Sequence, residues 1–566
     1  MSLTLLLSLF ACRSPDYGIT AQQLTLELTS PEYGEFLGAE AALVTGRVSP
    51  MSASLVIEDQ PVELAEDGSF SVALPMDGLD YRMIEVQASL ASQSLRERVP
   101  VFSGSNPALS WPGQATARLT EAGLDEIGET VGAFIDATGW DTMIVEQIPS
   151  LDTDWVDIYP TGLTHLPTVA LLEPDEDGIH TTILIEELSL GIEIDALDGW
   201  INIPIELGFS AVSVELLLSP TMEDDGSLWL YASEATIDLG ETEIELGSLD
   251  GWLVELILDA IVGFIEPLGD ILLESLLGEI SSIELGGPLE FDTDLLGTRL
   301  AASLSSLWTD DAGLGAGLGI GINDAAPSGA PTIPTPGDGD GDPSSHAQLA
   351  LHEGAIQLLL EDSFVDLLAS FDLGGMFGSI IGAGVAGLPG GDQAPSGDGW
   401  CVSLDPGSAY VVRMKSSLEP LAQLHMPDFR FTAGVQQGSD CVDWIDASLE
   451  LTLDIGLLDG RALDLQVQVP DGALLSYGAS PGSYDEDEVV AALGSYMGTM
   501  IGLLGGFLDF DLGELLGGLG GGGSEDPLGG VLGDLDVQFT DSRPLLNDDG
   551  TWTEGLYVLS LDLFAD

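Results

Sequence analysis

Residues 181–194 read Thr-Thr-Ile-Leu-Ile-Glu-Glu-Leu-Ser-Leu-Gly-Ile-Glu-Ile, with an apolar side chain at nearly every second position. Such alternation is typical of a β-strand with one buried face. Residues 200–209, 212–218 and 228–237 continue the pattern. Most strands are about five to six residues long, and longer ones suit a strongly twisted sheet. The sequence therefore predicts a sheet that curls on itself.

Helical patterns lie on either side of these alternating segments. Ile127, Val131, Phe134 and Ile135 recur at helical spacing, and residues 249–280 form a longer segment that is apolar on more than one face. A helix that is apolar most of the way round is buried. We therefore expect two helices to lie inside the curled sheet.

The same order of elements occurs a second time. Helical patterns cover residues 355–373 and 486–516, and strand patterns cover 347–352, 410–415, 429–434, 447–455, 463–469, 536–540 and 556–564. Residues 324–346 are rich in Pro, Gly, Ser and Asp, which is typical of a linker. We predict an α+β fold in which residues 114–323 and 347–566 form two repeats of one barrel-like architecture.

An all-β domain is expected before the repeats. Residues 24–104 contain about seven short alternating runs separated by turns, which predicts a β-sandwich. The segment resembles the bacterial Ig-like modules found on surface proteins. The resemblance implies a spacer without chemistry of its own.

The first residues resemble a bacterial lipoprotein signal. Residues 3–10 are apolar, and Leu9-Phe10-Ala11-Cys12 places a small residue before a cysteine. The resemblance assigns residues 1–12 to a lipoprotein signal that is cut before Cys12, and it implies acylation of Cys12, a tether at residues 13–23, and an exported outer-membrane lipoprotein facing the periplasm or the cell surface. No Lys or Arg precedes the apolar run, so an ordinary signal peptide or a wrongly assigned start codon is the alternative.

Cys401 and Cys441 are the other two cysteines of the chain. In an exported protein they most economically pair with each other. Closing a loop of about 40 residues contributes roughly 3 to 4 kcal/mol to stability. Neither cysteine lies in a CxxC motif or a Cys/His cluster, so zinc and redox roles have little support.

The charge of the chain excludes whole classes of partner. Among 566 residues, 12 Lys and Arg stand against 95 Asp and Glu, which gives a formal net charge of −83. This deficit of cations excludes most nucleic-acid-binding proteins and argues against anionic headgroups as electrostatic partners. Because 45% of residues are hydrophobic and the mean hydropathy is +0.28, the chain is not a disordered acidic one. We expect a charged shell around a large apolar interior.

Four short motifs occur along the chain in the same order as in a known family. They are Arg118-Leu119-Thr120-Glu121-Ala122-Gly123-Leu124, Gly251-Trp252-Leu253-Val254, Leu349-Ala350-Leu351 and Leu561-Asp562-Leu563-Phe564-Ala565. Their order resembles the family of bactericidal/permeability-increasing protein, lipopolysaccharide-binding protein and cholesteryl ester transfer protein, whose tubular lipid-binding (TULIP) domains pair two barrels. The resemblance implies that each barrel holds a phospholipid or sterol ester. The chain lacks the family's cationic N-terminal tip and a cysteine in its first barrel, so lipopolysaccharide recognition is not implied.

The residues themselves also favour a lipid slot. Glycine in place of bulky side chains leaves space between buried helices and a curled sheet, and an acyl chain of about sixteen carbons gains on the order of 12 kcal/mol on burial. We expect a non-catalytic, monomeric protein that binds or transfers a phospholipid or other neutral or zwitterionic lipid. The candidate lining residues, each of which could instead be plain core, are Phe134, Ile135, Trp252, Leu256, Ile257, Val262, Phe264, Phe364, Leu367, Leu368 and Phe371.

Two other interpretations stay open. Residues 373–391 and 489–508 are nearly uncharged, reach transmembrane length and carry a glycine at every fourth position. Their acidic flanks favour glycine-faced helices packed inside the second barrel over a membrane-inserted component. A surface structural or adhesion lipoprotein with closed barrels and no ligand is the second alternative.

Little in the sequence supports catalysis, a cofactor or a metal. Gly478-Ala479-Ser480-Pro481-Gly482 spells a nucleophile elbow, but Pro481 has no N–H to stabilise an oxyanion. Residues 338–342 mimic a calcium loop, but Pro343 stands where that loop needs glycine. No metal-ligand spacing relates the five histidines, which are His165, His180, His346, His352 and His425. We therefore predict no enzyme.

Overall fold

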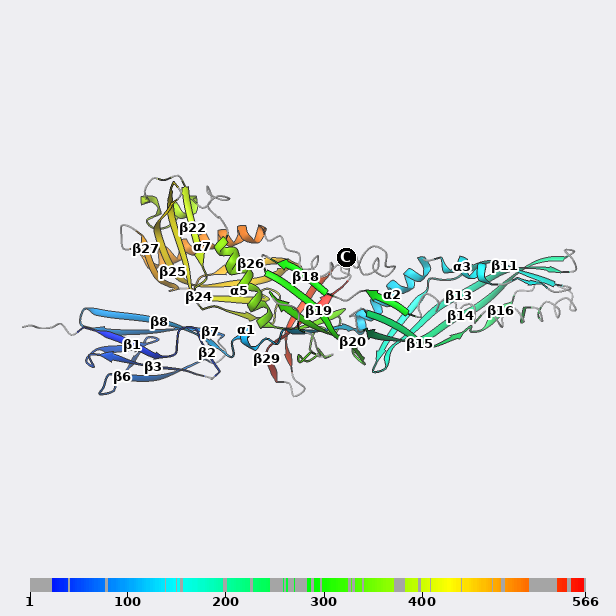
Figure 1. Ribbon diagram of the computed structural model, residues 1–566, viewed down its shortest axis with the longest axis horizontal. Helices are drawn as coiled ribbons and strands as arrows, with labels where there is room; N and C mark the ends of the chain where they lie inside the picture. Colours follow the sequence, from blue (N-terminus) through cyan, green and yellow to red (C-terminus); the bar gives the residue numbers. More distant parts are fainter. Residues whose placement is uncertain are drawn as a thin grey trace, which may run out of the picture. The chain divides into compact units, whose positions relative to one another are not determined.

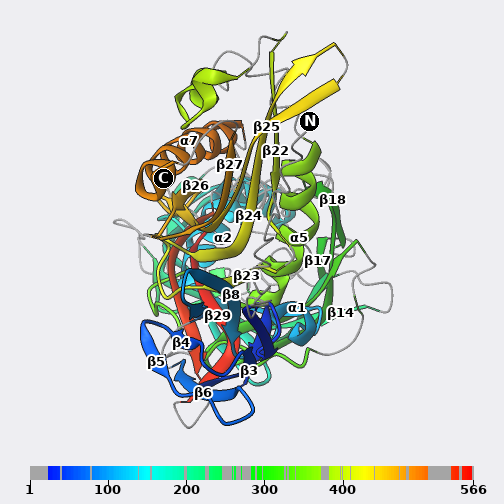
Figure 2. The ribbon, with the colours of Figure 1, turned by 90° about the vertical axis from the view of Figure 1, so that its left-hand side faces the viewer.

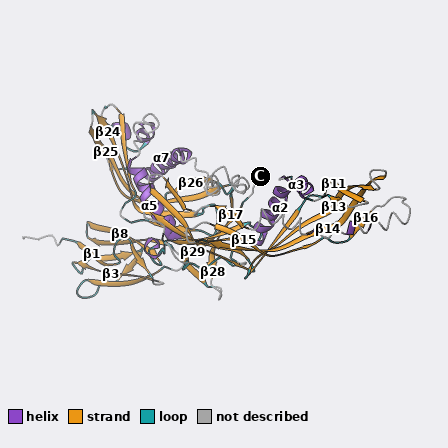
Figure 3. Cartoon of the chain, turned by 45° about the vertical axis from the view of Figure 1, so that its right-hand side comes forward, coloured by secondary structure: helices purple, strands orange, loops and turns teal. Residues whose placement is uncertain are grey.

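The computed structural model describes the chain from residue 23 to residue 563, with long gaps at 245–281, 371–381 and 508–536. Within the first of these gaps only Leu258, Ile261, Val262 and Gly269 are described. Shorter gaps lie at 39–40, 77–79, 138, 149, 153–155, 197–200, 224–227, 287–289, 296–297, 324–326, 328–330, 338–339, 395–396, 398, 408, 439, 471, 480–483 and 547–550. The described part is mostly strand, with few helices (Figure 3).

The chain divides into two compact units, Met1–Ser105 and Asn106–Asp566. In the first unit, one sheet has the order β1 (Thr25–Ser30), β3 (Ala41–Ser49), β6 (Ser69–Pro75). The other has the order β2 (Glu35–Leu37), β8 (Gln93–Ser103), β7 (Tyr81–Leu90), β4 (Ser54–Ile57), β5 (Gln60–Val62). Side chains from both sheets form one apolar core, which makes the unit a β-sandwich. Its Ig-like character stays a prediction.

The second unit begins with a curled sheet, here named the first curled sheet. Its strands are β10 (Leu151–Asp152), β11 (Val156–Thr164), β12 (Val169–Asp175), β13 (Gly178–Ala196), β14 (Ile201–Met222), β15 (Leu228–Asp238), β16 (Thr242–Ile244) and β17 (Ser282–Gly286). The alternation predicts residues 200–209 and 212–218 as separate segments, but residues 201–209 and 212–218 lie within the single strand β14. The predicted long strands therefore exist, and one is longer than expected.

A matched shift in side-chain phase bends β13 and β14. On β13 the buried positions change from odd to even numbers across Glu186 and Glu187, and on β14 they change from odd to even across Ser210 and Ala211. Glu186 opposes Ala211, so the two shifts lie side by side. An extra residue in a strand moves its apolar set to the other face unless its partner shifts too. The paired shifts keep both apolar sets on one face while the sheet curls.

Helix α2 (Glu121–Ala137) closes the edge of the first curled sheet and leads into α3 (Trp140–Gln147). A Cβ added at Gly128 or Gly132 would lie 2.3 Å from the carbonyl oxygen of Ala170 or Thr168, respectively, both at β12. Asp136 accepts hydrogen bonds from the backbone N–H of Thr168 at 3.0 Å and from its hydroxyl at 2.5 Å. The two glycines therefore let the helix lie directly against the strand.

The second curled sheet lies in the other half of the unit. Its strands are β22 (Gly399–Asp405), β23 (Val411–Met414), β24 (Ala422–Gln437), β25 (Asp440–Leu458), β26 (Ala462–Gln468) and β27 (Leu474–Ala479). Helix α5 (Glu353–Ser370) packs on β22 and β23, whereas α7 (Glu486–Phe507) packs on β26 and β27. Figure 2 shows the two helices on different sides of β24 and β25. A short 3-10 helix, η1 (Gly391–Gln393), precedes β22.

A central sheet joins the two halves. Its order is β18 (Glu290–Leu295), β19 (Thr298–Asp310), β20 (Gly313–Ile322), β9 (Gln114–Thr120), β21 (Ala347–His352), β29 (Trp552–Asp562) and β28 (Gln538–Leu546). Strands β18, β19, β20 and β29 are drawn between the strands of the two curled sheets (Figure 1). Each predicted repeat thus gives strands to a shared sheet that the local sequence patterns do not indicate.

The central sheet also holds a segment whose composition predicts a linker. This segment, here named the strap, comprises residues 331–337 and 340–346. The hydroxyl of Thr116 donates to the carbonyl of Pro334 at 2.8 Å, and the hydroxyl of Thr120 donates to that of Ser345 at 2.6 Å. The buried glycines of β20 make room for this chain, because a Cβ at Gly317 would lie 2.7 Å from Pro331. The glycine-rich residues of β20 thus form the strand face against which the strap lies.

Helix α7 packs mainly through its larger side chains, which corrects the expectation of a glycine-faced helix, although Gly494 lies at ordinary contact distance from Val469. Its buried side chains include Val489, Leu493 and Met497, whereas Gly498 and Gly502 are exposed with nothing within 4 Å of an added Cβ. Long side chains fill the concave face of the sheet, and glycine has none to offer. Among the residues that the structure describes, no helix has the length and apolar composition needed to cross a membrane.

We predict that Gly128→Ala lowers the free energy of unfolding by about 1–3 kcal/mol, because the new Cβ meets a backbone oxygen that cannot move alone. The matched control is Gly498→Ala in α7, which has open space around it and should raise stability by about 1 kcal/mol through helix propensity. Urea unfolding of both variants measures the difference. Equal effects of the two substitutions would show that α2 does not need its close contact with β12.

Candidate functional site

Two apolar interiors are the main candidates for a functional site. The first interior lies between the first curled sheet and helices α2 and α3. Its buried residues on β13 run from Ile179 to Ile194, a path of about 50 Å at the usual rise per residue. Leu207, Phe209 and Val212 of β14 extend the same surface. This is a long, continuous aliphatic lining.

The second interior lies between the second curled sheet and helix α7. From the sheet come Phe429 and Phe431 of β24 and Leu449 and Leu451 of β25, all buried. From α7 comes the face that includes Leu493, while side chains of α5 are partly buried against the same cluster. Each half of the unit therefore contains its own apolar interior.

Among the described residues, each interior contains an aromatic side chain whose polar atom is buried without a hydrogen-bond partner. In the first interior this atom is Nε1 of Trp140, whose ring lies 4.8 Å from that of His165. In the second it is the hydroxyl of Tyr496, whose ring meets Phe431 edge to face at 5.3 Å. Burial raises the pKa of Tyr496 far above its usual range, so the phenol stays protonated. Neither residue belongs to the lining predicted from the sequence.

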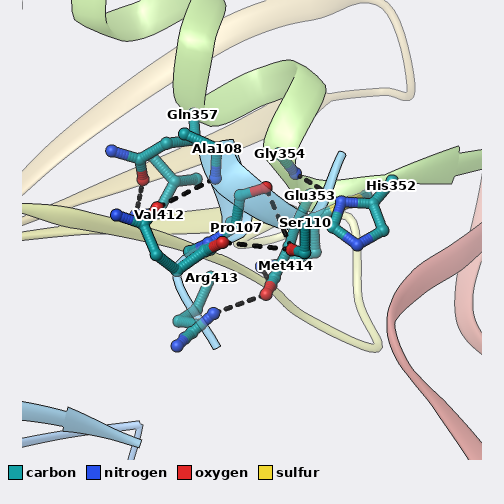
Figure 4. Close-up of polar contacts among 11 residues, drawn as sticks. Pro107, Ala108, Ser110, His352, Glu353, Gly354, Gln357, Val412, Arg413 and Met414 are labelled. Atoms are coloured by element: carbon teal, nitrogen blue, oxygen red, sulfur yellow. Dashed lines mark hydrogen bonds and ion pairs between the residues drawn. The ribbon is translucent and has the colours of Figure 1, made fainter. Parts of the chain in front are cut away.

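A buried polar cluster fastens the start of α5 to the second curled sheet (Figure 4). Glu353 forms an ion pair with Arg413 of β23, and the two side chains are 5% and 8% exposed. The side-chain oxygen of Gln357 accepts from the backbone N–H of Val412 at 2.6 Å. Breaking such a pair by removing one partner costs about 3–5 kcal/mol, because it leaves a buried charge alone. The cluster therefore holds the helix in place.

His352 lies directly before this helix. Its Nδ1 accepts a hydrogen bond from the backbone N–H of Gly354 at 3.0 Å, and the side chain is buried. Burial lowers the pKa of His352; the Glu554 carboxylate opposes this shift and Arg413 adds to it. The neutral imidazole is thus the form that fits the fold. Close packing continues at Gly354, where a Cβ would lie 2.1 Å from the carbonyl oxygen of Pro107 in α1 (Pro107–Ser110).

The structure places few of the lining residues predicted from sequence. Ile135 is buried in the first interior. Val262 is 64% exposed while its neighbour Ile261 is fully buried, so Ile261 is the residue of this turn that lies in the core. Phe134 lies in α2, and α5 contains three more predicted residues, but the side chains are not described for Phe134, Phe364, Leu367 and Leu368. The remaining candidates lie outside the described residues: Trp252, Leu256, Ile257, Phe264, Phe371 and the lipidation candidate Cys12.

Cys401 and Cys441 form a disulfide, with 6.2 Å between their Cα atoms. It links β22 to β25, which both pair with β24, and a Cβ at Gly434 of β24 would lie 2.4 Å from the Sγ of Cys441. Glycine at this position therefore leaves room for the crosslink. The disulfide fixes the strands at one end of the second curled sheet.

Asp340 and Asp342 of the strap accept local hydrogen bonds, whereas Asp338 of the predicted calcium loop lies outside the described residues. Asp342 accepts hydrogen bonds from the N–H and hydroxyl of Ser344, which lower the pKa of Asp342, and Asp340 accepts from the N–H of Gly337 at 2.7 Å. Within the described ranges, no three His, Cys, Asp or Glu residues are grouped so that they could hold a metal ion. The carboxylates of the strap instead stabilise its turns.

No protein-family model and no curated protein matches the sequence. Among solved structures, the crystal structure of lipopolysaccharide binding protein aligns over 82% of this chain and 100% of its own, with a TM-score of 0.45 and 11% identity. P47 of Clostridium botulinum E1 aligns over 80% and 99%, with a TM-score of 0.24 and 9% identity. Latherin aligns over 28% and 79%, with a TM-score of 0.18 and 20% identity. Because these TM-scores are low, the likenesses carry no argument about function.

We predict that His352→Asn changes the pH dependence of stability. The folded-state pKa of His352 lies below its unfolded value, so the unfolded chain takes up the proton first. The contribution of His352 is therefore complete above about pH 6.5 and is lost as the pH falls below that value. Asparagine can accept the same backbone hydrogen bond but does not titrate. The free energy of unfolding of the unaltered chain should fall more steeply than that of His352→Asn between about pH 8 and 5, and parallel pH dependences would contradict the assignment.

Proposed function

We propose that the chain is a non-catalytic lipid-binding or lipid-transfer protein that holds acyl chains in its first and second interiors. One observation carries this proposal: each half combines a curled sheet, lined with aliphatic side chains, with helices that cover the lining. An acyl chain of about sixteen carbons gains on the order of 12 kcal/mol gross in such surroundings. This gain is large enough to offset removal of a lipid from a bilayer.

The proposed architecture is two tandem tubular lipid-binding barrels of the TULIP type that share the central sheet. The first unit would act as an Ig-like spacer, and acylated Cys12 would anchor the chain, as a monomer, to the bacterial outer membrane. Two acyl chains suffice for stable anchoring, whereas one binds reversibly. A spacer between anchor and barrels would keep both interiors away from the membrane surface until lipid is exchanged.

The proposed cargo is a neutral or zwitterionic lipid. The sequence has no Lys or Arg between Arg118 and Arg299, a stretch that includes α2, α3 and the strands of the first curled sheet. The sequence also has no Lys or Arg between Arg461 and Arg543, a stretch that includes α7. Anionic headgroups are usually held by such side chains. A lipid whose headgroup carries no net charge does not require them.

We predict that the chain in its unacylated form, beginning after Cys12 and purified without detergent from a bacterial envelope, carries lipid in both interiors by native mass spectrometry. Ala447→Phe adds bulk to the second interior, where Ala447 of β25 is fully buried, and should remove the lipid of that half alone. Val442→Phe is the matched control, because Val442 lies in the same strand but is 43% exposed. It should keep the lipid content of the unaltered chain.

The opposite outcome has a clear signature. If the interiors are closed cores, the unaltered chain carries no lipid and takes up none from vesicles. Ala447→Phe would then overpack the core and lower the free energy of unfolding by about 1–3 kcal/mol. That result would favour a structural or adhesion protein.

We predict that Cys12→Ser releases the protein from the membrane fraction and abolishes incorporation of labelled palmitate, because the serine cannot be acylated as a lipoprotein cysteine is. Cell fractionation measures the first effect and autoradiography the second. A Ser8→Ala change in the same segment serves as the control and should leave both unchanged. Labelled, membrane-bound Cys12→Ser protein would overturn the anchor.

A further inference from the structure

The unpartnered polar atoms of Trp140 and Tyr496 stand out within the two interiors. The two side chains are 4% and 6% exposed, and both belong to the apolar clusters that define the interiors. Buried polar groups in folded proteins are almost always hydrogen-bonded, because an unmet donor loses its water without compensation. An orphan donor in each of two separate interiors therefore calls for a common explanation.

The chemistry of the two groups limits what could meet them. An indole N–H can only donate a hydrogen bond, and a protonated phenol donates readily. The property that the two side chains share is thus donation, so the missing partner is an acceptor. Neither donor carries a charge, and the sequence has no Lys or Arg between Arg118 and Arg299, the stretch that contains Trp140.

We propose that Trp140 and Tyr496 are specificity-determining residues that each donate a hydrogen bond to the carbonyl oxygen of an ester-linked lipid. The inference rests on the proposed function and deepens it. An acyl ester combines a long apolar chain with a neutral acceptor at one end, which is the pairing that each interior offers. Alkanes fit the apolar lining but leave the donor unmet, and fatty-acid anions bring a charge for which the stretches around Trp140 and Tyr496 provide no Lys or Arg.

The packing around the donors agrees with fixed anchoring. Gly384 leaves space for the ring of Tyr496, because a Cβ there would lie 2.4 Å from Cδ2 of the tyrosine. Phe431 holds the other side of the ring at 5.3 Å between centroids. The ring of Trp140 is held by His165, whose Nδ1 lies 2.6 Å from the carbonyl oxygen of Leu166. Held rings present their donors in a set direction, which favours selective recognition.

The test compares methyl palmitate with octadecane, an alkane of similar length, on the full chain by native mass spectrometry titration. The unaltered chain should bind the ester about tenfold more tightly than the alkane, as expected for one net hydrogen bond. Tyr496→Phe should remove this preference at one site, Trp140→Phe at the other, and the double variant at both. Alkane affinity should not change.

Tyr477→Phe is the matched control, because its hydroxyl already donates to the carbonyl of Pro389. It should keep the preference for the ester. Infrared spectra of ¹³C-labelled methyl palmitate add a readout that altered packing would not mimic: the bound carbonyl stretch should lie at lower frequency in the unaltered chain and return upward in Tyr496→Phe.

The outcomes separate this inference from the proposed function. If both lipids bind and Tyr496→Phe and Trp140→Phe keep the ester preference, the donors are not anchors although the interiors still carry lipid. Equal affinity of the unaltered chain for ester and alkane would also overturn the inference. If neither lipid binds the unaltered chain, the proposed function fails with it.

Discussion

The pairing of β9 with β21 is the contact on which the second unit depends. Leu119 opposes Ala347 across this antiparallel ladder, although more than two hundred residues separate them in the chain. Without it, each half would expose an edge strand with unpaired N–H and C=O groups. The strap crosses the same strands and satisfies the side chains of Thr116 and Thr120. The two apolar interiors are therefore parts of one unit, held by a sheet that belongs to both.

Local sequence patterns predict the strands well because alternation directly reflects one buried face. The pattern at residues 181–194 lies within β13, and its counterpart in the second half, residues 447–455, lies within β25. The central sheet is different, since nothing in the pattern of residues 347–352 indicates that its partners are β9 and β29. Composition also misleads at residues 331–337 and 340–346, which it predicts to be part of a linker, because the strap lies against the glycine face of β20.

The residues of the candidate site are also hard to predict from the sequence, but the reason differs from that for the central sheet. Large apolar residues at helical spacing identify buried faces, and Ile135 is an example, but the phase of a helix decides whether Ile261 or Val262 faces the core. Trp140 and Tyr496 carry no such signal. Whether a buried N–H or O–H has a partner depends on every element around it, so only the folded arrangement reveals an orphan donor.

The buried polar side chains at the start of α5 have hydrogen-bond partners, whereas the donors of Trp140 and Tyr496 have none. At the start of α5, Glu353 and Arg413 pair with each other, and Gln357 bonds a strand backbone. At this position the fold provides partners for the polar side chains that it buries. Trp140 and Tyr496 lie in the interiors without one, at a cost in stability. A buried donor without a partner destabilises the lipid-free protein but stabilises a complex in which a ligand accepts its hydrogen bond. In the proposed complex, an acceptor on the bound lipid supplies this hydrogen bond in both halves.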